Sequence, residues 1–263
     1  MKLLRLAVLL LMNLFVLYSA AALAEKQTII SDKNDYEGRT IETVYEPGDE
    51  QYNNVQKNIS YLDRNQKMIK IEYFYADTYV NKQGYYRAAT FYDSNEKMTR
   101  VEYFFTDTYM NEKGSSRKTA YFDTNERLTR EERFYTDKFA GEQGYDKKIA
   151  YFDSNEKMEK IKYFYTDSYV DKQGCYTVTS YFDSNERPMR EERFYADKFA
   201  GEQGYDKKIA YFDSNGKMIK IEYFYINKFA NEQGFNKAIG YLDSNEKVTK
   251  VEYYLNDRII QPK

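Results

Sequence analysis

The tyrosine and carboxylate side chains have the greatest capacity for chemistry in this sequence. The 263 residues include 30 Tyr, 17 Phe and 42 Asp or Glu, but no His, no Trp and one Cys. Without His, neither a Ser-His-Asp triad nor a His-built zinc or haem site can form. The composition does not exclude catalysis by carboxylates, which needs two carboxyl groups about 5–10 Å apart in a cleft.

The acidic motifs are copied along the chain and form no unique group. One aspartate recurs every 30 residues, at Asp63, Asp93, Asp123, Asp153, Asp183, Asp213 and Asp243, and an asparagine follows two residues after each. An active site normally requires one distinct constellation of residues. Spacing such as that of Lys220 and Glu222 is typical of cross-strand ion pairs on a solvated face. We therefore expect no enzymatic activity and no cofactor.

The stretch 213–216, Asp-Ser-Asn-Gly, imitates the start of an EF-hand calcium loop. Such a loop needs a bidentate Glu at its twelfth position, and that position is Phe224. An Asp that bonds its own backbone, followed by Asn and Gly that tolerate positive φ, is typical of a hairpin turn. The sequence therefore predicts a turn here and no metal site.

One set of tyrosines shares a phase of the repeat and supplies the candidate ligand-binding residues. They are Tyr73, Tyr103, Tyr163, Tyr223 and Tyr253. Their rings can pair across strands, which contributes roughly 0.2–1 kcal/mol per pair. They can also form an extended face that stacks on sugars or peptide side chains, since Tyr offers a large contact area at low entropy cost. Both interpretations stay open, and both can hold on opposite faces.

A fixed period of 30 residues organises the chain that must position these side chains. Six full units cover 61–240, and a partial capping unit covers 241–263. Residues 25–60 form an N-terminal segment with a degenerate capping unit. Fixed periods of 20–50 residues with atypical ends are the signature of repeat arrays.

Each unit contains two strand-like runs and two turns. In the run 217–225, Ile219, Ile221, Tyr223 and Tyr225 lie on one predicted face and Met218, Lys220, Glu222 and Phe224 on the other. The connection 197–204 predicts a helical turn with Asp197 as N-cap and Gly204 in the left-handed position that ends it. Each unit is therefore predicted to be a β-hairpin with a short helical turn.

About fifteen such strands in sequence order predict an all-β fold. We expect an antiparallel meander, elongated or curled into a solenoid, because open twisted sheets rarely exceed about 10 strands. Two nearly identical units, 121–150 and 181–210, place Glu131 with Arg133 and Glu191 with Arg193 where other units have Ile or Val and Tyr. We interpret these pairs as a partly solvated patch of opposite charges.

The hairpin motif resembles repeats of known bacterial families. Residues 211–218, Tyr-Phe-Asp-Ser-Asn-Gly-Lys-Met, followed by Glu222 and Tyr223, resemble the hairpin of MORN-variant repeats in YwqK-type, antitoxin-like proteins. The motif is also similar to glucan- and choline-binding repeats and to the YD repeats of large secreted shell proteins. The MORN-variant period is shorter, and the Trp residues of the sugar- and choline-binding repeats are absent here. The resemblances imply non-catalytic binding or scaffold roles.

The N-terminal residues 1–24 have the three parts of a secretory signal peptide. Lys2 and Arg5 precede an apolar run, and a small-x-small site at 22–24 follows it. The run is shorter than the ~20 residues that span a bilayer, so we expect no stable membrane insertion after cleavage. We expect the protein to be periplasmic or secreted. Cleavage leaves 38 basic and 42 acidic residues with evenly mixed signs, so we expect no nucleic-acid partner.

Together these features predict an exported, non-enzymatic binding or scaffold module at the bacterial cell envelope. Its expected partner is a protein or an envelope glycan. An alternative is an antitoxin-like or inhibitor protein that binds one specific partner, and a carboxylate-based enzyme ranks below both. Cys175 stands at a phase held elsewhere by Tyr, Phe or Ser. It is an ordinary side chain or the source of a disulfide between two chains.

Overall fold

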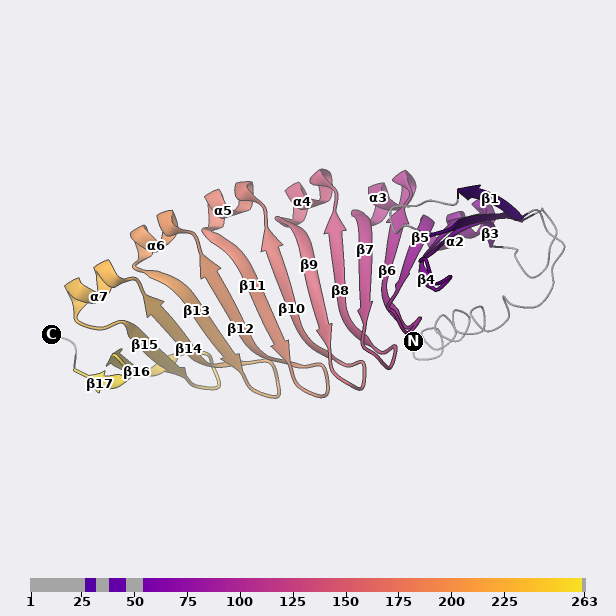
Figure 1. The fold of residues 1–263 in the computed structure, drawn as a ribbon. Coiled ribbons are helices and arrows are strands. Elements are labelled where there is room, and N and C mark those ends of the chain that lie inside the picture. The colour runs from indigo at the N-terminus through magenta and orange to yellow at the C-terminus, as the bar shows by residue number, and fades with distance from the viewer. Residues whose placement is uncertain (1–26, 32–37, 46–53, 262–263) are drawn as a thin grey trace.

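The computed structural model describes residues 27–31, 38–45 and 54–261, with side chains described from residue 38 onward. The strands form one antiparallel sheet of 17 strands. Each strand is hydrogen-bonded to the strands before and after it in the sequence. The sheet stays open, with the helices at one set of strand ends and the hairpin turns at the opposite set (Figure 1). We call these two sides of the sheet the helix edge and the turn edge. The predicted all-β meander is therefore confirmed.

The elements repeat in a fixed order, two strands and then one helix. The strands are β1 (Gln27–Ser31), β2 (Thr40–Val44), β3 (Val55–Leu62), β4 (Met68–Tyr75), β5 (Tyr85–Tyr92), β6 (Met98–Phe105), β7 (Ser115–Phe122), β8 (Leu128–Tyr135), β9 (Tyr145–Phe152), β10 (Met158–Tyr165), β11 (Cys175–Phe182), β12 (Pro188–Tyr195), β13 (Tyr205–Phe212), β14 (Met218–Tyr225), β15 (Lys237–Leu242), β16 (Val248–Leu255) and β17 (Arg258–Ile260). The helices are α2 (Asp77–Gln83), α3 (Asp107–Lys113), α4 (Asp137–Gln143), α5 (Asp167–Gln173), α6 (Asp197–Gln203) and α7 (Asn227–Gln233). The expected signal peptide lies outside the described residues.

Both faces of the sheet bury side chains, although the described strands form a single layer. Ala88 is 0% exposed on one face, and its neighbour Ala89 is 1% exposed on the other. Long neighbouring side chains lie across these small residues and cover them. We call the face that carries Tyr223 the tyrosine face, and the face that carries Glu222 the charged face. The core is thus divided between two faces of one sheet.

The predicted alternation of residues 217–225 fails at the start of the strand. Tyr211 pairs with Lys220, but Phe212 pairs with Met218, so Ile219 is an extra residue in a bulge. The Ile219 side chain is 45% exposed. It therefore does not continue the row of apolar residues on the tyrosine face, as strict alternation predicts.

The helical turns begin one residue earlier than the sequence predicts. Ala196 is the N-cap of α6, and Asp197 is the first helical residue. There its negative charge is stabilised by the helix N-terminus. In α4 the N-cap is Thr136, whose hydroxyl accepts a hydrogen bond from the Phe139 N–H at 3.4 Å. The C-terminal prediction is confirmed, because Gly204 ends α6 with φ of +85°.

The glycine that ends each of the helices α2 to α6 also makes room for the following unit. Gly144 has φ of +86°, and a side chain there would overlap the ring of Tyr169 in the next helix. The Gly144 carbonyl accepts a hydrogen bond from the Thr166 N–H at 2.8 Å. The glycine therefore ends one helix and leaves space for the aromatic ring of the next helix.

We predict that Gly144→Ala destabilises the protein and that Gly141→Ala stabilises it. The left-handed conformation at Gly144 costs a residue with a Cβ roughly 1–2 kcal/mol, and the clash with Tyr169 adds to that. Gly141 lies within α4 with nothing within 4 Å of an added Cβ. There Ala should raise helix stability by about 1 kcal/mol. Denaturant unfolding of both variants, followed by circular dichroism, checks this; equal effects would contradict it.

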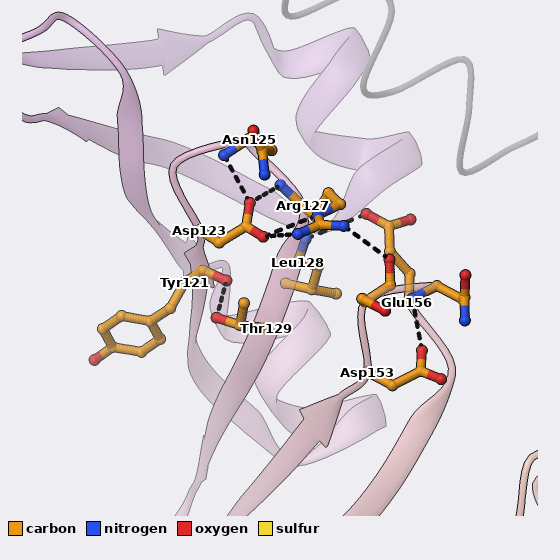
Figure 2. Close-up of polar contacts among 10 residues, drawn as sticks. Tyr121, Asp123, Asn125, Arg127, Leu128, Thr129, Asp153 and Glu156 are labelled. Carbon is orange, nitrogen blue, oxygen red and sulfur yellow. Dashed lines mark hydrogen bonds and ion pairs between the residues drawn. The ribbon is translucent and has the colours of Figure 1, made fainter.

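The hairpin turns are closed by their aspartates, as predicted. Asp123 Oδ1 accepts hydrogen bonds from the backbone N–H groups of Asn125 at 2.8 Å and Arg127 at 3.0 Å. The Arg127 guanidinium returns to the same carboxylate, with Nε 2.9 Å from Oδ2 (Figure 2). These hydrogen bonds from Arg127, with that from Asn125, lower the pKa of Asp123. The Asp123 carboxylate therefore stabilises the conformation of the turn.

A glutamate links each turn to the preceding hairpin. Glu156 Oε1 accepts a hydrogen bond from the Leu128 N–H at 3.2 Å (Figure 2), although φ of Glu156 is +58°. The same contact recurs in four other pairs, Met68–Glu96, Met98–Glu126, Met158–Glu186 and Met218–Glu246. Pro188 has no N–H, and the turn that would face it carries Gly216. Donor and acceptor are lost together, which indicates that this hydrogen bond maintains a glutamate in a left-handed position.

We predict that restoring both partners stabilises the protein more than the single changes imply. Gly216→Glu alone should destabilise, because φ of +79° is strained for Glu and Pro188 offers no donor. Pro188→Met with Gly216→Glu should recover about 1 kcal/mol of coupling, the net value of one hydrogen bond. A double-mutant cycle by denaturant unfolding measures it, and strictly additive effects would show that the hydrogen bond is unimportant.

Candidate functional site

The five predicted ligand-binding tyrosines lie in one row across the tyrosine face. The row takes one residue from each strand between β4 and β16 and runs through Tyr73, Ala88, Tyr103, Lys118, Arg133, Lys148, Tyr163, Val178, Arg193, Lys208, Tyr223, Ala238 and Tyr253. We call it the central row. All five tyrosines in it are half-buried. The structure therefore brings the predicted residues together on one face and separates them by other side chains.

Each of the last four tyrosines of the central row packs against an aromatic ring that lies in the preceding strand or, for Phe235, just before it. The ring centroids are 5.1 Å apart for Tyr85 and Tyr103, 5.0 Å for Tyr145 and Tyr163, 5.0 Å for Tyr205 and Tyr223, and 4.7 Å for Phe235 and Tyr253. The predicted aromatic packing is thus confirmed, and it fixes the orientation of these rings. Ligand binding stays a prediction, and it would use the same face as the packing.

The hydroxyls of Tyr103 and Tyr163 in the central row stay protonated at neutral pH. Burial, together with Tyr79 and Glu131 nearby, raises the pKa of Tyr103 to about 12. Burial, with Tyr145 and Glu191 nearby, raises the pKa of Tyr163. Neutral phenols can donate hydrogen bonds to a ligand oxygen while the rings offer apolar contact.

A group of basic side chains interrupts the tyrosines in the middle of the central row. Lys118, Arg133 and Lys148 are adjacent in register, and Glu131 lies beside them on the same face. Glu131 is 3.5 Å from Lys118 Nζ and 3.1 Å from an Arg133 nitrogen, whereas Lys148 has no ion pair in the described part of the chain. Lys118 also lies 4.6 Å from the ring centroid of Tyr103. We call these four residues the first basic cluster.

A smaller version of this cluster recurs four strands later. Arg193 and Lys208 are adjacent in register, and Glu191 is 2.7 Å from Arg193 Nε. Val178 stands where the first cluster has Lys118. We call Glu191, Arg193 and Lys208 the second basic cluster. The predicted patches of opposite charge are confirmed, but the lysines beside them were missed, because their place in the row depends on the strand register.

Lys148 and Lys208 are held in an environment that disfavours a positive charge. Burial, and then the charge of Arg133, lowers the pKa of Lys148. Burial, and then the charge of Arg193, lowers the pKa of Lys208 in the same way. At this phase other units carry Ala88, which is fully buried, so a cation is not required by the fold. A residue that costs stability at a position where an apolar one fits is a candidate for function.

The charged face is a lattice of basic, aromatic and acidic side chains. Lys220 Nζ lies 3.7 Å from the ring centroid of Tyr211 and 2.8 Å from Glu222. Lys237 on the next strand reaches Glu222 at 3.5 Å and lies 5.4 Å from the ring centroid of Phe224. The predicted pair of Lys220 and Glu222 therefore forms along one strand, and Lys237 supplies the cross-strand partner.

The lattice has a gap on β10, where Lys162 takes a position that is Glu in the other units. Lys160 and Lys162 have no ion pair among the described residues. They lie on rings instead, with Lys160 Nζ 4.3 Å from the centroid of Tyr151 and Lys162 Nζ 4.9 Å from that of Phe164. These two lysines lie on the charged face, on the strand that follows the first basic cluster.

The charges are sorted in space and not evenly mixed as the sequence suggests. Both faces carry more Lys and Arg than acidic residues; on the charged face, for example, Lys220 and Lys237 both contact the single carboxylate of Glu222. The turns and helices at the two edges carry more acidic than basic residues, with Asp213 in a turn and Asp197 at the start of a helix. A chain with a net charge of −2 thus presents basic faces between acidic edges.

The other groups considered as candidates, the acidic residues of the turns and Cys175, have structural contacts. Within the described ranges, no group of three or more Cys, Asp or Glu residues is placed to hold a metal ion. Asp213 Oδ1 accepts two backbone hydrogen bonds in its turn, at 2.8 Å and 3.0 Å. Cys175 is 4% exposed and packs with Val178 and Tyr195, and burial raises the pKa of its thiol. A disulfide between two chains would require this side chain to reach the surface.

Comparison with known proteins adds little to this description. No family model and no curated protein matches the chain. Among solved structures, the chain is similar to one titled "Crystal Structure of TcdB2-TccC3 without hypervariable C-terminal region", with 10% identity and a TM-score of 0.15. The alignment covers 92% of this chain and 15% of that one. A likeness of this size carries no argument about function. In the described part of the chain, no helix has the length and apolar character to cross a membrane.

We predict that Lys148→Leu raises the free energy of unfolding at pH 7, by about 0.5 kcal/mol. Because the folded-state pKa of Lys148 is lowered, the unfolded chain binds the proton more tightly, and the protonated lysine costs stability. The gain should disappear as the pH rises past the unfolded value near ~10.4. Urea unfolding between neutral and alkaline pH measures it, with Lys208→Leu as an independent copy. A loss of stability at pH 7 in both variants would contradict it.

Proposed function

We propose that this protein is an exported, non-enzymatic binding module of the bacterial cell envelope, whose tyrosine face holds an extended glycan or protein segment. The observation that carries the proposal is the central row, which spans thirteen consecutive strands, β4 to β16, on one face of an open sheet and places five half-buried tyrosines along it. A row of this kind suits a long ligand better than a compact one.

The dimensions of the row support an extended ligand. Tyr103 and Tyr163 are four strands apart, and so are Tyr163 and Tyr223. At 4.7–4.9 Å per strand, each interval is about 19 Å. Rings held by packing lose little entropy when a ligand stacks on them, so they are efficient contact residues.

A binding role is favoured over catalysis because the polar motifs are repeated and used by the fold. Each turn aspartate accepts backbone hydrogen bonds, and the glutamates of the charged face are paired with Lys or Arg, as Glu222 is with Lys220 and Lys237. A catalytic carboxylate needs a distinct environment that perturbs its pKa upward, whereas the pKa of Glu222 is lowered, since the hydrogen bonds and charges of those two lysines outweigh its burial. Export rests on the signal-peptide features of the N-terminal sequence.

We predict that removal of one ring of the central row weakens ligand binding without loss of the fold. Tyr163→Ala and Tyr223→Ala should each reduce affinity about tenfold or more, as expected for an aromatic anchor worth at least ~1.4 kcal/mol. Tyr163→Phe, which keeps the ring, should bind nearly as well as the wild type. Tyr176→Ala is the matched control, because Tyr176 is 44% exposed and packs near Phe194 on the charged face.

Binding would be measured on glycan arrays and with envelope fractions, alongside thermal unfolding of each variant. Equal losses in Tyr163→Ala and Tyr176→Ala would show that the tyrosine face has no special role. A tight one-to-one complex with one envelope protein, insensitive to the Tyr163 and Tyr223 changes, would instead favour the inhibitor role.

A further inference from the structure

We infer that the two basic clusters bind the carboxylate groups of an acidic polysaccharide, while the neighbouring tyrosines stack on its sugar rings. This inference rests on the proposed function and specifies its ligand class. It uses the part of the central row where the sequence alone indicated only a mixed-charge patch. Its main residues are Arg133 and Lys148 of the first cluster, and Arg193 and Lys208 of the second.

The first basic cluster has more positive charge than its own carboxylate can neutralise. Glu131 is shared between Lys118 and Arg133, and Lys148 has no ion pair among the described residues. A bound carboxylate would neutralise part of this excess positive charge.

The fold does not need cations at these positions. The phase of Lys118 and Lys148 is occupied by Ala88 and Ala238 in other units, and both alanines are buried. Three adjacent cations repel each other, and burial lowers the pKa of Lys148 further. Basic residues that the scaffold tolerates at a cost are best explained by a ligand that compensates their charge.

Tyrosines border the clusters where sugar rings would lie. Tyr103 precedes the first cluster in the central row and Tyr163 follows it, and Tyr223 follows the second cluster. Lys208 Nζ is 5.8 Å from the ring centroid of Tyr223, so charge and ring form one surface. A sugar acid has an apolar ring face for tyrosine and a carboxylate for Arg or Lys, and bidentate Arg–carboxylate contact is among the strongest of hydrogen-bonded pairs.

The two clusters are spaced for one long chain. Arg133 lies on β8 and Arg193 on β12. These two strands are four apart in the sheet (Figure 1). At 4.7–4.9 Å per strand, the separation is about 19 Å. A polymer that reaches both clusters gains from a high effective concentration at the second site. Affinity should therefore rise steeply with the length of the polysaccharide.

Nucleic acid fits this arrangement less well, although aromatic rings and basic residues also occur in single-strand binding proteins. Such proteins follow the phosphate backbone with a continuous basic groove. Here Tyr163 and Val178 separate the two clusters, and the edges of the sheet are acidic. An acidic polypeptide offers carboxylates but no rigid ring faces for the tyrosines.

The test compares polygalacturonate with its methyl-esterified, uncharged form by isothermal titration calorimetry on the full mature chain. The variant Arg133→Gln with Lys148→Gln leaves Glu131 paired with Lys118. It should lose tenfold or more in affinity for polygalacturonate and little for the ester. The matched control is Lys160→Gln with Lys162→Gln, which removes the same charge from the same region on the opposite face and should stay within twofold of the wild type. Thermal unfolding verifies that both variants fold.

A second comparison tests the spacing. Long polygalacturonate should bind at least tenfold tighter than an oligomer too short to span about 19 Å. The variant Arg193→Gln with Lys208→Gln should remove this advantage and leave the short oligomer nearly unaffected. An unchanged length dependence in that variant would overturn the two-cluster arrangement.

Several outcomes would overturn the inference. Equal losses in the first-cluster variant and the opposite-face control would show attraction by net charge only. Equal affinity for poly-L-glutamate or single-stranded DNA would remove the polysaccharide as the ligand class. Binding of the ester as tightly as the acid would refute charge recognition, yet leave the proposed binding module intact. Lack of binding to polygalacturonate, alginate and hyaluronan would refute the acidic ligand, and only failure of neutral glycans and envelope proteins as well would refute the proposed function.

Discussion

A single-layer sheet has no second layer to cover it, and this constraint governs the whole molecule. Each small central residue must be covered by long side chains from the neighbouring strands of the same face. On the charged face, Lys or Arg side chains lie along aromatic rings and meet a glutamate, as Lys220 does between Tyr211 and Glu222. On the tyrosine face, rings lie against rings, as Tyr205 and Tyr223 do. The abundance of tyrosine and of mixed charge is the chemical consequence.

Contacts at the helix edge and at the turn edge fix the position of each unit relative to the next. At the helix edge, a glycine such as Gly144 leaves space for the ring of the next helix. At the turn edge, a glutamate such as Glu156 accepts the N–H of the preceding hairpin. Each contact joins one unit to the next, so stability depends on nearest neighbours, as in other repeat arrays. A unit of another length would lose both contacts, which accounts for the absence of insertions.

This rigid framework leaves some positions free to vary in chemistry. The phase that holds Ala88 in one unit holds Lys148 in another, with the backbone register unchanged. Substitutions within the central row can therefore change what the tyrosine face binds without changing the fold. The nearly identical units 121–150 and 181–210 both carry a Glu, an Arg and a Lys on the tyrosine face, which are Glu131, Arg133 and Lys148 in the first unit and their counterparts in the second. Duplication therefore placed two similar clusters at a fixed distance.

The period, the hairpins, the turns and the all-β class could all be predicted from the sequence, because they depend on local chemistry such as the Asp of each hairpin turn and the Gly that ends each helix. The sequence also placed Tyr103 and Tyr163 in one phase. It did not place Lys118, Arg133 and Lys148 side by side, because they come from three strands and meet only through the register of the sheet. Nor did the sequence show the bulges, such as that at Ile219, that break strict alternation at the start of a strand. The acidic edges and basic faces follow from that register, and no linear count of charges reveals them.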